Sequence, residues 1–312
     1  MSVLICGSIA YDNIMVFRGR FRDHILPDQI HILNVAFLVP DMRQELGGCA
    51  GNIAYSLKLL GGDPLVMATV GRDFGRYRVR LAEHGLDMRH ITEIPDALTA
   101  QAYITTDLDD NQITAFHPGA MDHAHVNRVP ADAGIRIGVV SPDGRQGMVD
   151  HAAQCAAAGI PYMFDPGQGL PMFDGEELRR FIGQAAWVTV NDYEGRLLSE
   201  RTGWTEEEIA GRVRALIVTR GGQGSTIFAG GRRIDIPVVT PERIADPTGC
   251  GDAYRAGLLH GIGRGLSWEE TGRLAALIGA LKIARKGTQN HHFTPATLAS
   301  AYQAAFGHGI RL

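Results

Sequence analysis

The sequence predicts an α/β protein whose central sheet is mostly parallel and flanked by helices, with a small additional β layer. Two observations lead to this fold class. Between residues 135 and 219, short apolar runs alternate with segments of helical period, which is typical of βαβ units. Two earlier stretches, 13–45 and 99–118, contain strand-like runs without a helical period and therefore predict a separate β layer. The large domain then consists of 1–12, 46–98 and 119–312.

The chain begins with a short buried strand at 3–6, which Gly7 ends. Asp12 follows closely, and a charge just beyond a buried strand is placed where ligands bind in open α/β sheets. A solvated aspartate in a turn has the same pattern, so this position alone does not decide. Two further strands are predicted at 14–17 and 30–39, within the first part of the β layer.

A glycine-rich turn from Gly47 to Gly51 precedes a helix that ends near Leu60. Glycines let a ligand approach the backbone closely, and the Asn52 amide offers a donor and an acceptor, which suits a sugar diol. Small residues also permit close helix packing, so the turn is weak evidence by itself. The elements that follow are a strand at 65–70, a helix at 76–84, and a hairpin with strands at 100–106 and 112–116.

Strands and helices alternate in the second half of the chain. The predicted strands are 135–140, 162–164, 187–190 and 215–219, and the helices between them are 146–158, 176–185 and 205–212. In a parallel sheet, polar residues at the carboxyl ends of strands converge on one crevice. Such residues here are Asp12, Asp165, Asn191, Glu194 and Thr219. A hairpin at 225–229 and 233–237 and helices at 253–262, 268–285 and 294–305 complete the prediction.

A glycine turn before the helix at 253–262 carries the strongest functional signal. Pro247 removes a backbone donor, and Gly249 and Gly251 loosen the chain, so regular structure begins only after them. Such a turn directs backbone N–H groups and the helix dipole at one point, which favours an anion. A carboxylate beside that anion, Asp252, makes sense as a base. The combination indicates phosphoryl transfer, although Asp residues also cap helices without any further role.

Composition and motifs argue against several other functions. A net charge of -4 over 312 residues gives no basic surface for nucleic acid, and no apolar run of about 18 residues predicts a membrane helix. The amino terminus lacks the features of a signal peptide. Four scattered cysteines without a CxxC pair favour reduced thiols in a cytoplasmic protein. A GxxxxGK[ST] loop, a GxGxxG turn after the first strand and a GxSxG elbow are all missing.

Two motifs resemble those of the ribokinase-like (PfkB) carbohydrate and nucleoside kinases. Gly47-Gly48 with Asn52 and Ala54 resembles the amino-terminal signature of that family. The segment 246–252 resembles its DTxGAGD motif, with Pro247 and Cys250 in place of Thr and Ala, both small enough to keep the turn. The resemblance covers essentially the whole chain. It implies a ribokinase-like fold in which a β-sheet lid, the β layer predicted above, closes over the sugar.

The resemblance also implies roles for individual residues. Asp252 is the implied base for a 5′ or other primary hydroxyl, and the implied anion hole is the backbone of Gly249, Cys250 and Gly251. The residues implied to bind the sugar are Asp12, Gly47, Gly48 and Asn52. Those implied to bind ATP are Asn191, Thr219, Gly221 and Gly224, with Glu194 organising Mg²⁺ through water. A monovalent cation, usually K⁺, is expected near Asp246 and Thr248.

Three segments, 6–13, 111–120 and 165–168, resemble the prokaryotic nucleoside-kinase branch, which phosphorylates adenosine and other purine nucleosides. An aromatic residue, Phe116 or Phe37, can stack on the base, and Gln168 can hydrogen-bond it. Alternatively, both phenylalanines fill the core of the lid. The hypothesis is ATP-dependent phosphorylation of a purine nucleoside. A sugar kinase acting on ribose or fructose and a nucleoside-binding protein without catalysis stay open, as do a monomer and a homodimer.

Cys250 has two interpretations. At a helix N-terminus its thiol can have a lowered pKa and be reactive. The interpretation that we favour is a small buried residue.

Overall fold

The computed structural model describes residues 2–25, 34–109 and 111–310. The strands are β1 (Ser2–Cys6), β2 (Ala10–Val16), β3 (Asp41–Gly47), β4 (Asp63–Gly71), β5 (Asp87–Ile94), β6 (Ala100–Thr106), β7 (Gln112–His117), β8 (Ile137–Val140), β9 (Tyr162–Phe164), β10 (Trp187–Asn191), β11 (Ala215–Thr219), β12 (Ser225–Ala229) and β13 (Arg232–Ile236). The α-helices are α1 (Cys49–Leu59), α2 (Gly75–Glu83), α3 (Arg145–Ala157), α4 (Gly175–Gln184), α5 (Asp192–Thr202), α6 (Glu206–Ala210), α7 (Cys250–Arg264), α8 (Trp268–Ile283) and α9 (Pro295–Phe306).

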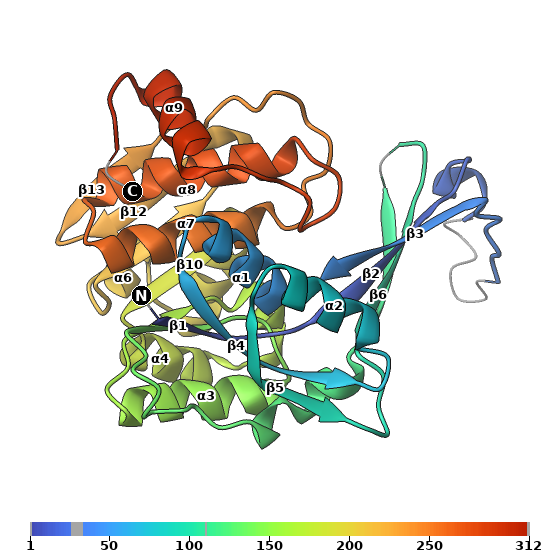
Figure 1. The fold of residues 1–312 in the computed structure, drawn as a ribbon, viewed down its shortest axis with the longest axis horizontal. Coiled ribbons are helices and arrows are strands. Elements are labelled where there is room, and N and C mark those ends of the chain that lie inside the picture. The colour runs from blue at the N-terminus through green and yellow to red at the C-terminus, as the bar shows by residue number, and fades with distance from the viewer. Residues whose placement is uncertain (1, 26–33, 110, 311–312) are drawn as a thin grey trace.

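Two sheets organise the described part of the chain. The large one has nine strands in the order β13-β12-β11-β10-β9-β8-β1-β4-β5, and its pairs are parallel except β11–β12 and β12–β13. The small one has four strands in the order β3-β2-β6-β7. Figure 1 shows the small sheet extending away from the body that the large sheet and its helices form. The predicted α/β class with a small additional β sheet is confirmed.

The large sheet is buried on both faces, which explains why its strands are continuous apolar runs rather than alternating ones. In β1, Val3 and Ile5 pack in the core that α1, α2, α7 and α8 cover. Leu4 and Cys6 point the other way and pack in the core under α3 to α6. Within the described residues, no helix is long and apolar enough to cross a membrane.

The structure differs from the sequence-based prediction in part of the small sheet, at β5 and at α5. Residues 34–39 form no strand, and the rest of the strand expected at 30–39 lies outside the described residues. The partner of β2 is instead β3, which follows directly. Strand β5 and helix α5 were not predicted. Both β3 and β5 carry many polar residues and are only partly buried, so neither has the apolar pattern that identifies a strand.

Candidate active site

The N-terminus of α7 is open. Its first residue is preceded by Gly249, which has φ of 78°, in the left-handed region that favours glycine, and no side chain caps the helix. Cys250 N donates to Pro247 O at 3.1 Å, which closes the turn before the helix. The N–H groups of a first helical turn have no acceptor within the helix, so this end can receive an anion. The turn that the sequence predicted therefore exists.

A chain of hydrogen bonds fixes the carboxylate of Asp252, the third residue of α7. Asn52 Nδ2 donates to Asp252 Oδ2 at 2.8 Å. Gln289 Nε2 donates to Asn52 Oδ1 at 3.0 Å and lies 2.6 Å from the hydroxyl of Tyr77, which in turn donates to Gly47 O at 2.8 Å. Because Gln289 engages the amide oxygen, the amide nitrogen of Asn52 faces Asp252 and holds its carboxylate as an acceptor. Sequence reasoning missed Gln289 and Tyr77, which lie far from Asn52 in the chain and follow no motif.

Burial and nearby charges raise the pKa of two carboxyl groups at the site. Burial raises the pKa of Asp252 to about 6, although the Arg255 guanidinium and the hydrogen bond from Asn52 oppose the shift. Burial, and then the negative charges of Asp252 and Asp246, raise the pKa of Asp12 to about 6. At neutral pH Asp252 is therefore mostly ionised, yet its pKa is close enough to neutrality for efficient proton acceptance.

Arg255 places a buried positive charge one turn after Asp252. Its Nε lies 2.5 Å from Asp165 Oδ2, and both side chains are almost fully buried. Asp165 follows β9, so this ion pair joins the start of α7 to the carboxyl edge of the large sheet. Nearby Asp165, Asp252 and Glu194 offset the burial of Arg255, and its pKa stays above the ordinary value. The sequence analysis identified Asp165 as a strand-end residue and missed its partner.

Asp12 lies within β2 and is buried, so the alternative of a solvated aspartate in a turn is wrong, and the residue belongs to the small sheet rather than to the end of β1. The two glycines expected near it are both required by close approach. A Cβ on Gly47 would overlap the Asp12 carboxylate, and Gly48 has φ of 85° with Ser8 O 2.5 Å from where its Cβ would lie. The backbone of 47–48 therefore lies directly against Asp12.

The register of the small sheet places Phe116 on the same face as Asp12. Asp12 pairs with Ala102, and Ala102 pairs with Phe116, and directly paired residues point to the same face. Phe116 is 49% exposed, so it does not fill a core. Phe37 instead packs against Phe17 and Phe21 with ring centroids 4.8 and 5.0 Å apart. The two interpretations of these phenylalanines thus separate: Phe37 packs in an aromatic cluster with Phe17 and Phe21, and Phe116 is exposed.

Gln168 is exposed in a 3-10 turn, Gly167–Met172, that follows β9.

The residues expected to bind ATP lie at the ends of β10 and β11. Asn191 and Thr219 are paired there as the last residues of their strands. Gly221 and Gly224 have φ of 51° and 84° in the turn that follows Thr219. Asn191 also caps α5: its Oδ1 accepts from Glu194 N at 2.7 Å, and Glu194 Oε2 accepts from Asn191 N at 2.8 Å. The sequence analysis did not identify this capping box.

Asp246 holds the turn before α7 in place. Its carboxylate accepts hydrogen bonds from Thr248 N at 2.9 Å and Gly287 N at 3.0 Å. Burial alone would raise the pKa of Asp246, but these bonds outweigh it and leave the pKa below its usual value. Burial raises the pKa of Cys250 to about 11, which supports the small buried residue over a reactive thiol.

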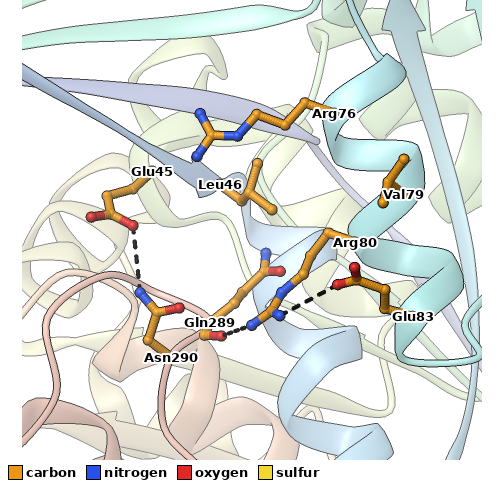
Figure 2. Close-up of a pocket in the computed structure, with 8 residues that line it drawn as sticks. All are labelled: Glu45, Leu46, Arg76, Val79, Arg80, Glu83, Gln289 and Asn290. Carbon is orange, nitrogen blue, oxygen red and sulfur yellow. Dashed lines mark hydrogen bonds and ion pairs between the residues drawn. The ribbon is translucent and has the colours of Figure 1, made fainter.

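A cavity of about 330 Å³ lies beside the site, between α2, the end of β3 and the segment 287–290 (Figure 2). Arg80 Nη2 donates to Gln289 O at 2.9 Å, and Arg80 also pairs with Glu83 at 3.7 Å. These contacts tie the segment that carries Gln289 to α2. The lining residues are Glu45, Leu46, Arg76, Val79, Arg80, Glu83, Gln289 and Asn290. Asp12, Asn52 and Asp252 are not among them, so the cavity is distinct from the open end of α7.

The solved structures and curated proteins similar to this chain include several nucleoside kinases. The nucleoside kinase of Burkholderia thailandensis in complex with inosine is 55% identical, with a TM-score of 0.91, over 98% of this chain and 99% of that one. The same enzyme in complex with ADP-inosine is 56% identical, with a TM-score of 0.88, over 99% and 98% of the two chains. A nucleoside kinase of Methanocaldococcus jannaschii is 31% identical, over 83% of this chain and 85% of its own.

The family comparison agrees with the geometry. Residues 12–295 match the pfkB family of carbohydrate kinases, a range that includes both glycine turns and Asp252. The chain therefore belongs to the pfkB carbohydrate kinase family.

Proposed function

We propose that this protein is an ATP-dependent kinase that transfers a phosphoryl group to the 5′-hydroxyl of a nucleoside. The observation that carries the proposal is the carboxylate of Asp252, held by Asn52 beside the open N-terminus of α7. The similarity to a nucleoside kinase in complex with inosine, over 98% of this chain, favours a nucleoside over a free sugar. A purine base is the finer expectation, and a sugar kinase acting on ribose or fructose is the alternative.

In this mechanism Asp252 accepts the proton of the substrate hydroxyl as the oxygen attacks the γ-phosphorus. Within 249–251, the backbone N–H groups of Gly249 and Gly251 would receive the negative charge of the transferring group, assisted by the dipole of α7. The N–H of Cys250 closes the turn by donating to Pro247 O. Asn52 keeps Asp252 oriented, and the buried guanidinium of Arg255 limits the rise of its pKa. Phosphoryl transfer depends on such positioning and charge neutralisation more than on covalent catalysis.

The adenine nucleotide would lie along the ends of β10 and β11, against Asn191, Thr219, Gly221 and Gly224. The donor atoms of Glu194 fit a magnesium ion held through water. Its Oε2 is engaged in the capping box, and no described residue donates a hydrogen bond to its Oε1. Burial raises the pKa of Glu194, while the charge of Arg255 opposes the shift. When bound, Mg²⁺ would neutralise phosphate charge there.

The small sheet would act as a lid over the nucleoside. It carries Asp12 toward the ribose and Phe116 on the same face, in position to stack on a base. Gln168 would approach the base from the other side of the cleft. We therefore propose the small sheet as the lid and the remaining residues as the nucleotide-binding domain. The strands of the lid lie mostly within the predicted segments 13–45 and 99–118, but β2 begins at Ala10, so the lid includes Asp12.

The monovalent cation expected near Asp246 and Thr248 fits less well than Mg²⁺. Both carboxylate oxygens of Asp246 accept backbone hydrogen bonds. Its carbonyl oxygen accepts a hydrogen bond from the ammonium group of Lys282 at 2.7 Å. The oxygens of Asp246 are thus occupied, and a positive charge is already present beside them.

The proposal is tested by ADP release with ATP and Mg²⁺ against adenosine, inosine, guanosine, cytidine, ribose and fructose, with mass analysis of the product. We expect nucleoside 5′-monophosphates from purine nucleosides and little turnover of free ribose. Turnover of free sugars alone would leave Asp252 as the base but replace the nucleoside by a sugar. No turnover of any compound would favour a binding protein without catalysis.

Two variants of β7 test the role of Phe116. Phe116→Ala should raise the KM for the nucleoside about tenfold, because base–aromatic stacking is worth about 1–3 kcal/mol. Ile113→Ala is the matched control, since Ile113 is also exposed on β7 but lies at an odd spacing from Phe116 and points to the opposite face. Equal effects of the two substitutions would contradict a specific contact with the base.

A further inference from the structure

Lys282 is a fully buried lysine that the mechanism above does not use. It lies near the end of α8, and none of its surface is exposed. Its Nζ donates to the carbonyl oxygen of Asp246 at 2.7 Å. Burying an ammonium group is costly unless it is compensated, so a lysine in this position requires an explanation.

The contacts of Lys282 place it beside Asp246, where the turn before α7 begins. Asp246 directly precedes the turn that opens α7, and its carboxylate orders both Thr248 and the segment at Gly287. The backbone N–H of Asp246 donates to Ile283 O at 3.1 Å, next to Lys282 itself. The end of α8 and the start of the turn are thus joined through both the backbone and the ammonium group.

The charges that face this ammonium group come from several elements. Asp246, Asp252 and Glu45 are acidic, and together with the Cys250 thiol they favour its charged form, while burial opposes it and lowers the pKa of Lys282. His291 also lies within range, and burial and then the charge of Lys282 lower its pKa to about 4, so that it is neutral at pH 7. Two guanidinium groups also face these acids: Arg43 lies 3.9 Å from Asp246, and the charge of Arg255 acts on Asp252. The three carboxylates still outnumber the two guanidinium groups, so the site holds more negative than positive charge without Lys282.

We propose that the Lys282 ammonium group replaces the potassium ion at this position and makes the enzyme independent of monovalent cations. An ammonium group is a compact unit charge that binds carbonyl oxygens, as K⁺ does. Here it binds the carbonyl oxygen of Asp246 and stabilises the turn from Pro247 to Cys250 before any ligand is present. Lys282 is a positioning residue, because it acts through the turn. This inference rests on the proposed kinase function for its activity readout.

The first experiment measures wild-type turnover of inosine with ATP and Mg²⁺ in potassium, sodium and tetramethylammonium chloride at equal ionic strength. We expect rates within twofold of one another. Stimulation of tenfold or more that saturates with K⁺ would overturn the proposal. Absence of turnover in every salt would contradict the kinase function and not the role of Lys282. In that case melting temperatures decide, with no K⁺-specific, saturable shift expected and such a shift counting against the proposal.

The second experiment removes the ammonium group of Lys282 and tests whether a monovalent cation from solution can replace it. Lys282→Met should lower turnover in tetramethylammonium at least tenfold, and K⁺ or NH₄⁺ should restore part of it. The matched control is Lys286→Met, which removes the same charge from an exposed position four residues later and should create no cation dependence. Equal loss in every cation would contradict the proposal. If Lys282→Met does not fold, the wild-type cation series still gives a decisive result.

Discussion

Two helices begin at the carboxyl edge of the large sheet in opposite ways. Helix α5 starts at Asn191 with a capping box, in which Asn191 and Glu194 satisfy each other's backbone N–H groups. Helix α7 starts at Gly249 with no side-chain cap, and its acidic third residue, Asp252, bonds Asn52 of α1 instead. Both helices carry an acid at the same position, but only α7 leaves its N-terminal N–H groups open.

The other helices with an acid at the third position behave like α5. Glu177, Glu208 and Glu270 each complete a capping box in α4, α6 and α8. An acid at the third position therefore usually completes a capping box at the helix N-terminus. What distinguishes Asp252 is a shorter side chain on a helix that starts from a left-handed glycine, together with a partner from another helix. The exception marks the site at which an anion is expected to bind.

The largest effect should come from Asp252→Asn. We expect turnover to fall on the order of 10²–10⁴-fold, the usual contribution of a general base. The nucleoside Kd from calorimetry should change little, because Asn keeps the shape of the side chain. Unchanged turnover would place the base elsewhere and remove the functional difference between α5 and α7.

A pair of glycine substitutions separates strain from function. Gly249 and Gly203 have φ of 78° and 71°, so alanine at either position should cost about 1–2 kcal/mol of unfolding free energy. Gly249→Ala should also lower turnover on the order of 10²-fold, because it displaces the turn that receives the phosphoryl group. Gly203→Ala, at the far end of α5, should leave turnover unchanged. A loss of stability in Gly249→Ala without loss of turnover would argue against the anion hole.

A pair of capping-box substitutions tests whether Glu194 only caps α5 or also helps to hold the Mg²⁺ of the nucleotide. Glu194→Ala and Glu208→Ala should each cost about 1 kcal/mol of stability in chemical denaturation, since each removes one half of a box. Only Glu194→Ala should also raise the Mg²⁺ concentration needed for half-maximal rate, by about tenfold. If the two variants respond alike to Mg²⁺, Glu194 is a helix cap and nothing more.

The last prediction concerns stability and its pH dependence rather than turnover. The pKa of Asp12 is about 6 in the folded protein against 3.8 as its ordinary value, so the folded state binds the proton more tightly. Its charge therefore destabilises the fold increasingly as pH rises from about 4 to about 6, and fully above that. Asp12→Asn should stabilise the free protein on the order of 1–3 kcal/mol at pH 8, with a smaller gain at pH 5. The matched control is Asp63→Asn at an exposed position, where a substitution usually changes stability by no more than about 0.5 kcal/mol.

The sequence predicted the parts of this comparison that rest on local patterns. Buried strands such as β1 and β8 are continuous apolar runs, and the turn at 246–252 has a specific spacing of glycine and acid. Helix α5 was missed because its opening residues, Asn191 to Glu194, were interpreted only as a ligand-binding strand end. The same residues serve the helix as a cap, a use that the spacing of Asn and Glu was sufficient to predict.

Contacts between distant segments were beyond sequence reasoning. The Asn52–Asp252 bond joins residues 200 positions apart, and the Gln289–Asn52 bond joins residues 237 apart. Neither Gln289 nor Lys282 belongs to a motif. Glutamine and lysine are most often exposed, so there was no reason in the sequence to expect a buried role for either residue. The packing of α1 and α8 against α7 brings Asn52 and Lys282 to the turn.

A crystal structure with ADP, Mg²⁺, aluminium fluoride and inosine would test the central claim most directly, because aluminium fluoride imitates the transferring phosphoryl group. We expect the fluoride within hydrogen-bond distance of the backbone N–H groups at 249–252, and the 5′-hydroxyl of inosine in contact with Asp252. Aluminium fluoride bound at another helix end, or a 5′-hydroxyl that faces a different base, would contradict it.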